Sequence, residues 1–289
     1  MDKHIQFIPQ ATGDGSYTFY SEEFQEAFHS SFGAKQEAEV RYIQPCSIKQ
    51  LATKQSTIRL LDICYGLGYN SAAALDAIWS VNPQCRVELF ALEISLDVPH
   101  QAIEHNLLAQ WRSPVPQLLA ELENQSLVRE KLLVAELLLG DARHTIQLII
   151  EKGWQADAVF LDPFSPPKCP QLWTVEFIQL VARCLAPTGR LATYSCSAAV
   201  RTALMIAGLK IISITGVGRK SPGTLALFEY KKAPLLSQKE REHLITKAAI
   251  PYRDRNLSLS AAEIVYTRQQ EQQQSNLEST SQWRKRWLK

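Results

Sequence analysis

Three carboxylates of this 289-residue chain each stand at the end of a short apolar run. Asp62 precedes a glycine-containing turn, Glu93 ends one run, and Asp162 precedes a stretch rich in proline. If the runs are parallel strands of one sheet, their carboxyl ends meet at the same edge, where open α/β sheets bind ligands. The sequence therefore predicts that these three acids converge on one bound ligand.

The turn after Asp62 reads CYGLGYN over residues 64–70, and it predicts a cofactor loop between a strand and a helix. Gly66 and Gly68 let the backbone approach a ligand without an intervening Cβ, and the helix offers free N–H groups to a polar ligand. Glycines also serve tight turns for geometry alone, so the loop by itself leaves both interpretations open. The candidate cofactor contacts in this loop are Asp62, Tyr65, Gly66, Gly68 and Asn70.

The acids around this loop favour a cationic cofactor. Glu93 lies 25 residues after Gly68, where doubly wound proteins place an acid against a ribose diol. Asp62 could hold the ammonium of an amino-acid group, and it would repel a pyrophosphate. Ser71 also replaces the third glycine of the dinucleotide motif. We therefore expect S-adenosyl-L-methionine rather than NAD.

Asp141 and Ala142 follow another apolar run and add a candidate contact for adenine. An acid at this place can accept a hydrogen bond from the adenine amino group. Asp is also a favoured N-cap for the helix expected from Ala142. Because the two roles can coexist, both residues stay candidates for cofactor binding.

The stretch FLDPFSPPKCP, residues 160–170, predicts the reaction side of the site. Methyl transfer from a sulfonium needs an acceptor lone pair in line with the methyl carbon. Asp162 could orient a protonated amine or accept its proton; it could equally cap a turn before proline. Phe164 and Trp173 could stack on a base or belong to the core, and Lys168 could contact a phosphate or solvent.

The elements that must position these residues alternate between apolar runs and helical stretches. Strands are expected at 58–63, 87–93, 132–139, 158–162, 190–194, 210–214 and 224–230, and helices at 70–79, 96–108, 141–152, 173–185 and 198–207. This alternation predicts a Rossmann-like α/β fold with a doubly wound, mostly parallel seven-stranded sheet. Together with the expected cofactor, it suggests the fold of a class I methyltransferase. The last two strands are expected to form a hairpin that adds one antiparallel strand at the edge.

Three parts of the chain are expected: an N-terminal extension (1–50), a methyltransferase domain (51–230) and a basic helical or flexible tail (231–289). Ser21–Glu23 predicts a helix start, 117–130 a helical insertion, 237–248 a helix, and the glutamine-rich 269–274 a loosely ordered stretch. The tail carries 12 Lys/Arg and 6 Asp/Glu, which favours a polyanionic partner such as tRNA or simply a solvated tail. The candidate tail contacts are Arg253, Arg255, Arg284, Lys285 and Arg286.

Composition narrows the class of protein. The six cysteines include no C-x-x-C pair, so we expect neither a zinc site nor another metal site. No run offers the roughly 20 apolar residues that a membrane span needs, and nothing at the start has the pattern of a signal peptide. We therefore expect a cytoplasmic protein.

From Tyr17 to Tyr230 the chain resembles the methyltransferase part of the bifunctional tRNA-modification protein MnmC. The ordered P-x-K-x-P-x-x-W of Pro166–Trp173 is the most distinctive part of the likeness. The resemblance implies methylation of the 5-aminomethyl group of wobble uridine 34 in tRNA. It also implies that Asp162 is the acid of the reaction and Glu93 the ribose acid. The candidate substrate contacts are Phe164, Lys168, Trp173, Arg219 and Lys220.

The chain departs from the family at three points. Cys64 stands where the loop usually has its first glycine, and Pro163 stands where a small residue is usual. The flavin-dependent oxidase part is missing, so we expect the substrate to arrive as the free aminomethyl form.

Two other functions stay open. An aminopropyltransferase of the spermidine-synthase type should line its pocket with further acids, whereas 163–170 holds none and one lysine. A catalytically silent RNA-binding protein on this scaffold would not need Asp62, Glu93 and Asp162 to be intact.

Overall fold

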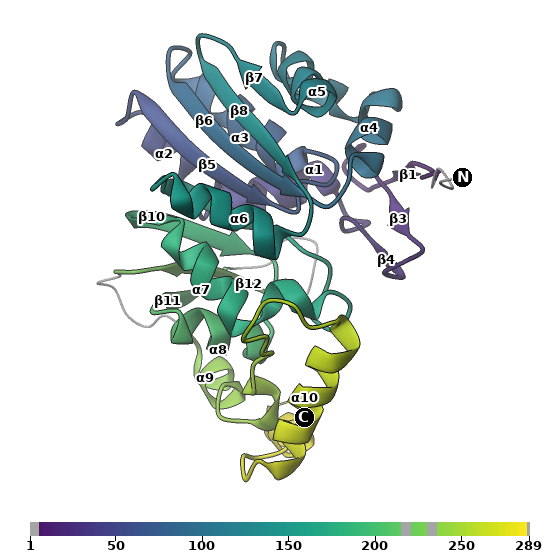
Figure 1. The fold of residues 1–289 in the computed structure, drawn as a ribbon, viewed down its shortest axis with the longest axis vertical. Coiled ribbons are helices and arrows are strands. Elements are labelled where there is room, and N and C mark those ends of the chain that lie inside the picture. Colours follow the sequence, from purple (N-terminus) through teal and green to yellow (C-terminus); the bar gives the residue numbers. More distant parts are fainter. Residues whose placement is uncertain (1–5, 215–220, 230–235, 288–289) are drawn as a thin grey trace.

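The computed structural model describes residues 6–214, 221–229 and 236–287. Its centre is an eight-stranded sheet in the order β11-β12-β10-β9-β5-β6-β8-β7 (Figure 1). The strands are β5 (Thr57–Ile63), β6 (Arg86–Glu93), β7 (Leu127–Arg129), β8 (Leu133–Leu139), β9 (Ala156–Leu161), β10 (Leu185–Thr193), β11 (Lys210–Ile214) and β12 (Gly223–Leu227). The five strands from β10 to β8 are mutually parallel.

Helices cover both faces of the sheet, which is why its central strands are apolar on both sides. Side chains of β5 alternate between the two cores: Leu60 packs on one side, and Leu61 and Ile63 pack on the other. The first face carries α1 (Ala34–Ala38), α2 (Ile48–Ala52), α3 (Tyr69–Val81), α4 (Asp97–Glu104) and α5 (Val115–Gln125). The second carries α6 (Ala142–Glu151), α7 (Val175–Arg183) and α8 (Ala198–Ile206).

The predicted class of fold is confirmed, with two differences in the sheet. All seven expected strands are present, but β7 is an eighth strand in a stretch that was expected to be helical. It forms because Ser126 ends α5 in the left-handed region with φ 58°, which turns the chain back antiparallel to β8. The antiparallel strand β12 also lies between β10 and β11 instead of at the edge.

The N-terminal part holds two small hairpins, β1 (Gln10–Ala11) with β2 (Tyr17–Thr18) and β3 (Tyr20–Ser21) with β4 (Glu26–Ala27). The expected helix start at Ser21–Glu23 is wrong. Ser21 Oγ accepts a hydrogen bond from Phe24 N, as an N-cap would, but Gln25 takes the left-handed region with φ 53°. The chain therefore turns back into β4. A π-helical turn, η1 (Glu39–Ile43), leads toward the sheet.

The C-terminal part contains α9 (Gln238–His243), η4 (Lys247–Ala249), α10 (Ala261–Gln274) and α11 (Thr280–Trp287). The glutamine-rich stretch 269–274 forms the last turns of α10, so its expected looseness is wrong. Ile264 is fully buried against the core, and Gln272 Nε2 donates to Lys247 O over 2.8 Å. The helix expected over 237–248 is shorter, because α9 ends at His243.

Candidate active site

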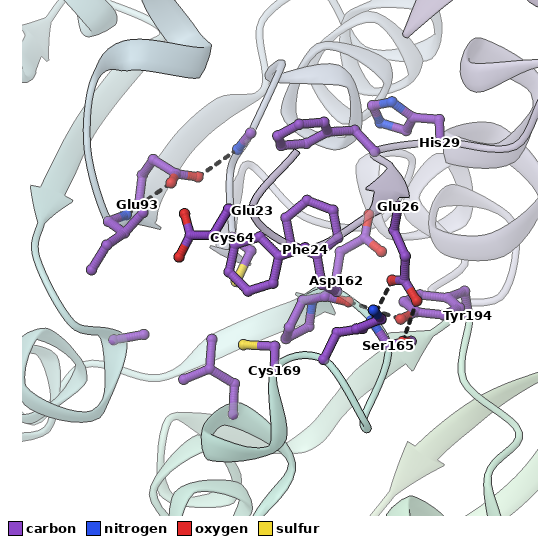
Figure 2. A pocket seen from close by; sticks show the side chains of 18 of the residues that line it. Glu23, Phe24, Glu26, His29, Cys64, Glu93, Asp162, Ser165, Cys169 and Tyr194 are labelled. Carbon is purple, nitrogen blue, oxygen red and sulfur yellow. Dashed lines mark hydrogen bonds between the residues drawn. The ribbon is translucent and has the colours of Figure 1, made fainter. Parts of the chain in front are cut away.

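A cavity of about 880 Å³ opens at the carboxyl ends of β5, β6, β8, β9 and β10. Its other wall comes from residues 23–32 of the N-terminal part, so segments far apart in the sequence face one another (Figure 2). This is the edge at which open α/β sheets bind ligands, and the volume lies in the range of small-molecule sites.

Cys64 and Gly66 of the glycine turn line this cavity after β5, whereas Gly68 and Asn70, two of the predicted cofactor contacts, do not. Gly66 and Gly68 have φ 54° and 77°, values that favour glycine. A Cβ on Gly68 would lie 2.5 Å from Tyr65 Oη, so the space is also closed to a side chain. Cys64 takes φ 67° although it is not glycine, at a conformational cost of about 1–2 kcal/mol.

Glu93 lies beside this turn and faces the cavity (Figure 2). Its two oxygens accept hydrogen bonds from Gly66 N and Ile94 N, each over 2.8 Å. Burial raises the pKa of Glu93, and these backbone N–H groups oppose that rise. Since a carboxylate offers about four acceptor positions, it keeps capacity for the two hydroxyls of a diol.

Asp162 faces the same cavity from the end of β9 (Figure 2). One oxygen accepts a short hydrogen bond from Tyr42 Oη, and the other accepts Asn70 Nδ2 over 2.9 Å. Tyr42 is fully buried in η1. Its burial, followed by the charge of Asp162, raises the pKa of its phenol well above the usual value. The phenol is therefore a neutral donor that fixes the orientation of this carboxylate.

Asp62 and Tyr65, both predicted to contact the cofactor, are buried outside the cavity lining. Asp62 Oδ2 accepts a hydrogen bond from Ser71 Oγ over 2.6 Å, and burial raises the pKa of Asp62 well above its ordinary value. Tyr65 Oη donates to Glu123 over 2.8 Å. Glu93 and Asp162 therefore line the cavity, whereas the Asp62 side chain lies behind the lining and is hydrogen-bonded to Ser71 in α3.

Asp141 and Ala142 line the cavity at the end of β8. Asp141 caps α6 by accepting Arg143 N over 2.9 Å, so the N-cap interpretation is confirmed. The Arg143 guanidinium also holds this carboxylate, with Nη2 at 2.6 Å from Oδ2. Burial acts to raise the pKa of Asp141, but the hydrogen bonds from Arg143 hold it below its ordinary value.

The proline-rich loop carries Phe164 and Lys168 to the cavity. Trp173 is fully buried instead and donates Nε1 to Phe164 O over 2.8 Å. It therefore supports the loop from the core, which is the second of the two roles that the sequence left open for it. Phe164 stacks on Phe24 at 4.2 Å between ring centroids and meets Phe28 edge-on.

The N-terminal part adds acids that the sequence analysis did not place here. Glu23, Glu26 and Glu37 line the cavity, and Glu26 accepts hydrogen bonds from both Ser165 N and Ser165 Oγ. The absence of acids from 163–170 therefore no longer argues against a polyamine acceptor. A cavity wall this acidic suits a cationic ligand, since like charges would repel an anion.

Several sequence predictions concern other parts of the chain. Arg219 and Lys220 lie outside the described residues. In the tail, Arg253 pairs with Glu176, and Arg286 pairs with Glu242 and Glu278. The side chains of Arg255, Arg284 and Lys285 are exposed. Within the described ranges, no helix is long and apolar enough to cross a membrane, and no group of three or more His, Cys, Asp or Glu side chains is placed to hold a metal ion.

The sequence analysis missed Tyr42, Glu26 and Arg143 as parts of the site. A buried tyrosine in a short extension gives no periodic signal, and Glu26 was hidden in a stretch expected to begin a helix. For Arg143 a signal existed, because it lies two residues after the N-cap acid, within reach of that side chain in the first helical turn.

Comparisons with known proteins agree with this architecture. A family model described as S-adenosyl-L-methionine-dependent methyltransferase matches residues 99–229. An uncharacterized protein of Methanocaldococcus jannaschii is 32% identical over 269 residues, which cover 90% of this chain and 70% of that protein. The crystal structure of MnmC2 from Aquifex aeolicus matches with a TM-score of 0.81 at 32% identity, covering 93% of this chain and 86% of that one.

A further relative is a longer protein. The tRNA 5-methylaminomethyl-2-thiouridine biosynthesis bifunctional protein MnmC of Acidovorax sp. is 27% identical over 231 residues. The match covers 76% of this chain and 35% of the relative. The chain thus spans about a third of the length of this bifunctional protein.

Proposed function

We propose the following function from the family of this chain, which belongs to the S-adenosyl-L-methionine-dependent methyltransferases related to MnmC2 of Aquifex aeolicus. The chain methylates the 5-aminomethyl group of wobble uridine 34 in tRNA. One observation carries the proposal: Asp162 and Glu93 face one acidic cavity at the carboxyl edge of the sheet. The product would be 5-methylaminomethyl-uridine, the group named for the relative in Acidovorax sp.. Such a substrate would be met in the cytoplasm.

The residues at the cavity fit S-adenosyl-L-methionine, which supplies an electrophilic methyl group on a sulfonium. Glu93 would accept hydrogen bonds from the ribose hydroxyls, because its carboxylate keeps free acceptor positions. Gly66 would let the backbone lie close to the ligand. Asp141 and the N–H of Ala142 would meet the adenine edge. Asp62 and Ser71 would support the glycine turn from below without touching the ligand.

Asp162 would act on the acceptor. An alkylamine is protonated at neutral pH, as lysine is, and it must lose a proton before its nitrogen can attack a methyl carbon. The fixed carboxylate can orient the ammonium and accept that proton. With that proton on Asp162, the amine nitrogen would present its lone pair to the methyl group that the cofactor supplies. Phe164 would cover the acceptor base, and Lys168 at the cavity rim would meet a phosphate.

The direct test uses bulk tRNA from cells that lack this protein. We expect methyl-labelled cofactor and the purified chain to place label in 5-methylaminomethyl-uridine, as read by nucleoside mass spectrometry. Label in a different nucleoside, or no label in RNA, would contradict the proposed acceptor. Aminopropyl transfer to putrescine from the decarboxylated cofactor would establish the polyamine alternative, and the absence of calorimetric heat with S-adenosyl-L-methionine would establish a silent scaffold.

The role of Asp162 has its own test. Asp162→Ala should lower kcat about 100-fold or more, because general acid–base groups contribute rate factors of that size. The affinity for the cofactor should change much less, since Glu93 and Asp141 are left in place. Near-normal turnover would remove Asp162 from the mechanism.

A further inference from the structure

We infer that Asp254, in the C-terminal part, is a positioning residue of the cofactor site that acts through Arg143 on Asp141. The inference rests on the proposed contact between Asp141 and adenine. It gives the C-terminal part a role in cofactor recognition, although the family model that matches this chain ends at residue 229.

The three side chains form a continuous chain of ion pairs. Arg143 Nη1 donates to Asp254 Oδ2 over 2.8 Å, while Nη2 donates to Asp141 Oδ2 over 2.6 Å. The guanidinium thus uses opposite sides of its planar fork for the two carboxylates. Because an arginine held at both ends loses its rotational freedom, Asp254 fixes the angle at which Arg143 presents itself to Asp141.

Burial restricts the positions that the Asp254 and Arg143 side chains can take. The Asp254 side chain is 0% exposed, and that of Arg143 is 12% exposed. Asp254 also accepts hydrogen bonds from Ser258 N and Leu259 N, so it is fixed within its own turn. A buried charge that loses its partner is strongly unfavourable. Movement of Arg143 away from this pair toward the cavity is therefore disfavoured.

The pair is not what attaches the C-terminal part to the domain. Glu176 accepts Asp254 N over 2.8 Å and Arg253 Nε over 2.8 Å, and Thr174 pairs with Tyr252 in a β-bridge. These contacts join the segment to α7 and do not involve Arg143. Ala261, at the start of α10, completes the same wall by lining the cavity. The ion pair between Arg143 and Asp254 is therefore not needed to attach the segment. We assign it the role of holding Arg143 against Asp141, the carboxylate proposed to contact adenine.

The test compares two ligands that differ at the adenine amino group. Calorimetry measures the Kd of S-adenosyl-L-homocysteine and of its deaminated inosine analogue for the full chain. Asp254→Asn should weaken S-adenosyl-L-homocysteine about tenfold, the size expected for a misplaced charged hydrogen bond, and should leave the inosine analogue within about twofold. The preference for adenine therefore falls. Arg268→Met, which removes the hydrogen bonds to Ile250 O and Ala248 O in the same segment without touching Asp254 or Arg143, should leave that preference unchanged.

The outcomes separate the claims. An unchanged preference for adenine in Asp254→Asn, or the same loss of preference in Arg268→Met, would overturn the inference. If Asp254→Asn does not fold, Arg143→Lys tests the same link, because an ammonium cannot hold both carboxylates in the fork geometry; an unchanged preference there also overturns it. A wild-type chain without preference for adenine would overturn the inference together with the role of Asp141. The acceptor chemistry is judged separately by the labelled tRNA.

Discussion

Asp162 presents its carboxylate in one orientation because each oxygen accepts a hydrogen bond from a different buried side chain. Tyr42 reaches it from the N-terminal part, and Asn70 reaches it from the first turn of α3. The two donors therefore fix the orientation of the carboxylate, which suits a group that must first bind an ammonium.

Tyr42→Phe removes one of these two donors and keeps the aromatic ring that packs on Phe160. We expect kcat to fall about tenfold or more, since a hydrogen bond to a charged group contributes about 1.5–3 kcal/mol. The Kd for S-adenosyl-L-methionine should stay within about twofold, because Tyr42 lies on the acceptor side. Single-turnover kinetics with tRNA, together with calorimetry, measures both quantities.

The size of the side chain offers a control for Tyr42. If the fall in kcat came from altered packing, Tyr42→Leu would be much slower than Tyr42→Phe. If it comes from the lost hydrogen bond to Asp162, the two variants should be slow to a similar degree. An unchanged kcat in Tyr42→Phe, with a normal thermal unfolding curve, would show that Asn70 alone holds Asp162.

At the scale of elements, the hairpin β3–β4 forms part of the cavity wall. Phe24 stacks on Phe164, and Glu26 is hydrogen-bonded to Ser165 (Figure 2). One short hairpin thus holds the proline-rich loop by an aromatic contact and by a pair of hydrogen bonds. Because two-stranded hairpins are marginally stable alone, these contacts with the proline-rich loop also stabilise the hairpin.

Phe24→Ala should therefore speed the release of the cofactor. The stacked pair contributes about 0.5–1.5 kcal/mol beyond its burial, so we expect the dissociation rate constant to rise about tenfold. Stopped-flow displacement of a fluorescent cofactor analogue measures the rate. Ile8→Ala is the matched control, because Ile8 belongs to the same N-terminal part and is 74% exposed. Equal release rates in both variants would mean that the hairpin does not retain the cofactor.

Local sequence patterns predicted the elements better than the contacts between them. The strands and the glycine turn were predictable because apolar runs and glycines act within a few residues. Ser165 meets Glu26 across 139 positions, and Arg143 meets Asp254 across 111. No period or motif links such pairs. The side of the sheet that the Asp62 side chain faces could not be predicted either, because it depends on how α3 packs against β5.

At the scale of the whole molecule, segments from the N-terminal part and from the start of α10 both line the cavity at the carboxyl edge of the sheet. The N-terminal hairpins lie beside the upper strands, and the C-terminal helices lie beside α7 and α8 (Figure 1). Acids also gather near this edge, among them the buried Asp62 and Glu123 and the half-buried Glu93. Gathering acids there opposes folding at the pH where all of them ionise, because burial disfavours the charged form.

The effect of burial on the pH dependence of stability is largest to measure at Glu123. Burial raises the pKa of Glu123 to about 8, although the hydrogen bond from Tyr65 opposes the rise. Between its ordinary value of 4.5 and about 8, the folded chain keeps the proton and the unfolded chain releases it. Folding stability is therefore fully present below the lower value and falls as the pH rises, by about 1.4 kcal/mol per pH unit.

Glu123→Gln should remove this dependence, because a glutamine keeps an acceptor for Tyr65 and cannot ionise. Denaturant unfolding at pH values from about 5 to 9 should give a shallower loss of stability than in the wild-type chain, and the variant should gain most near the upper end. Glu121→Gln makes the same change of charge on α5 at a half-buried position, and it should keep the wild-type slope. If Glu123→Gln also kept that slope, Glu123 would be ionised in the folded chain, and its hydrogen bond from Tyr65 would be a bond to a charged carboxylate.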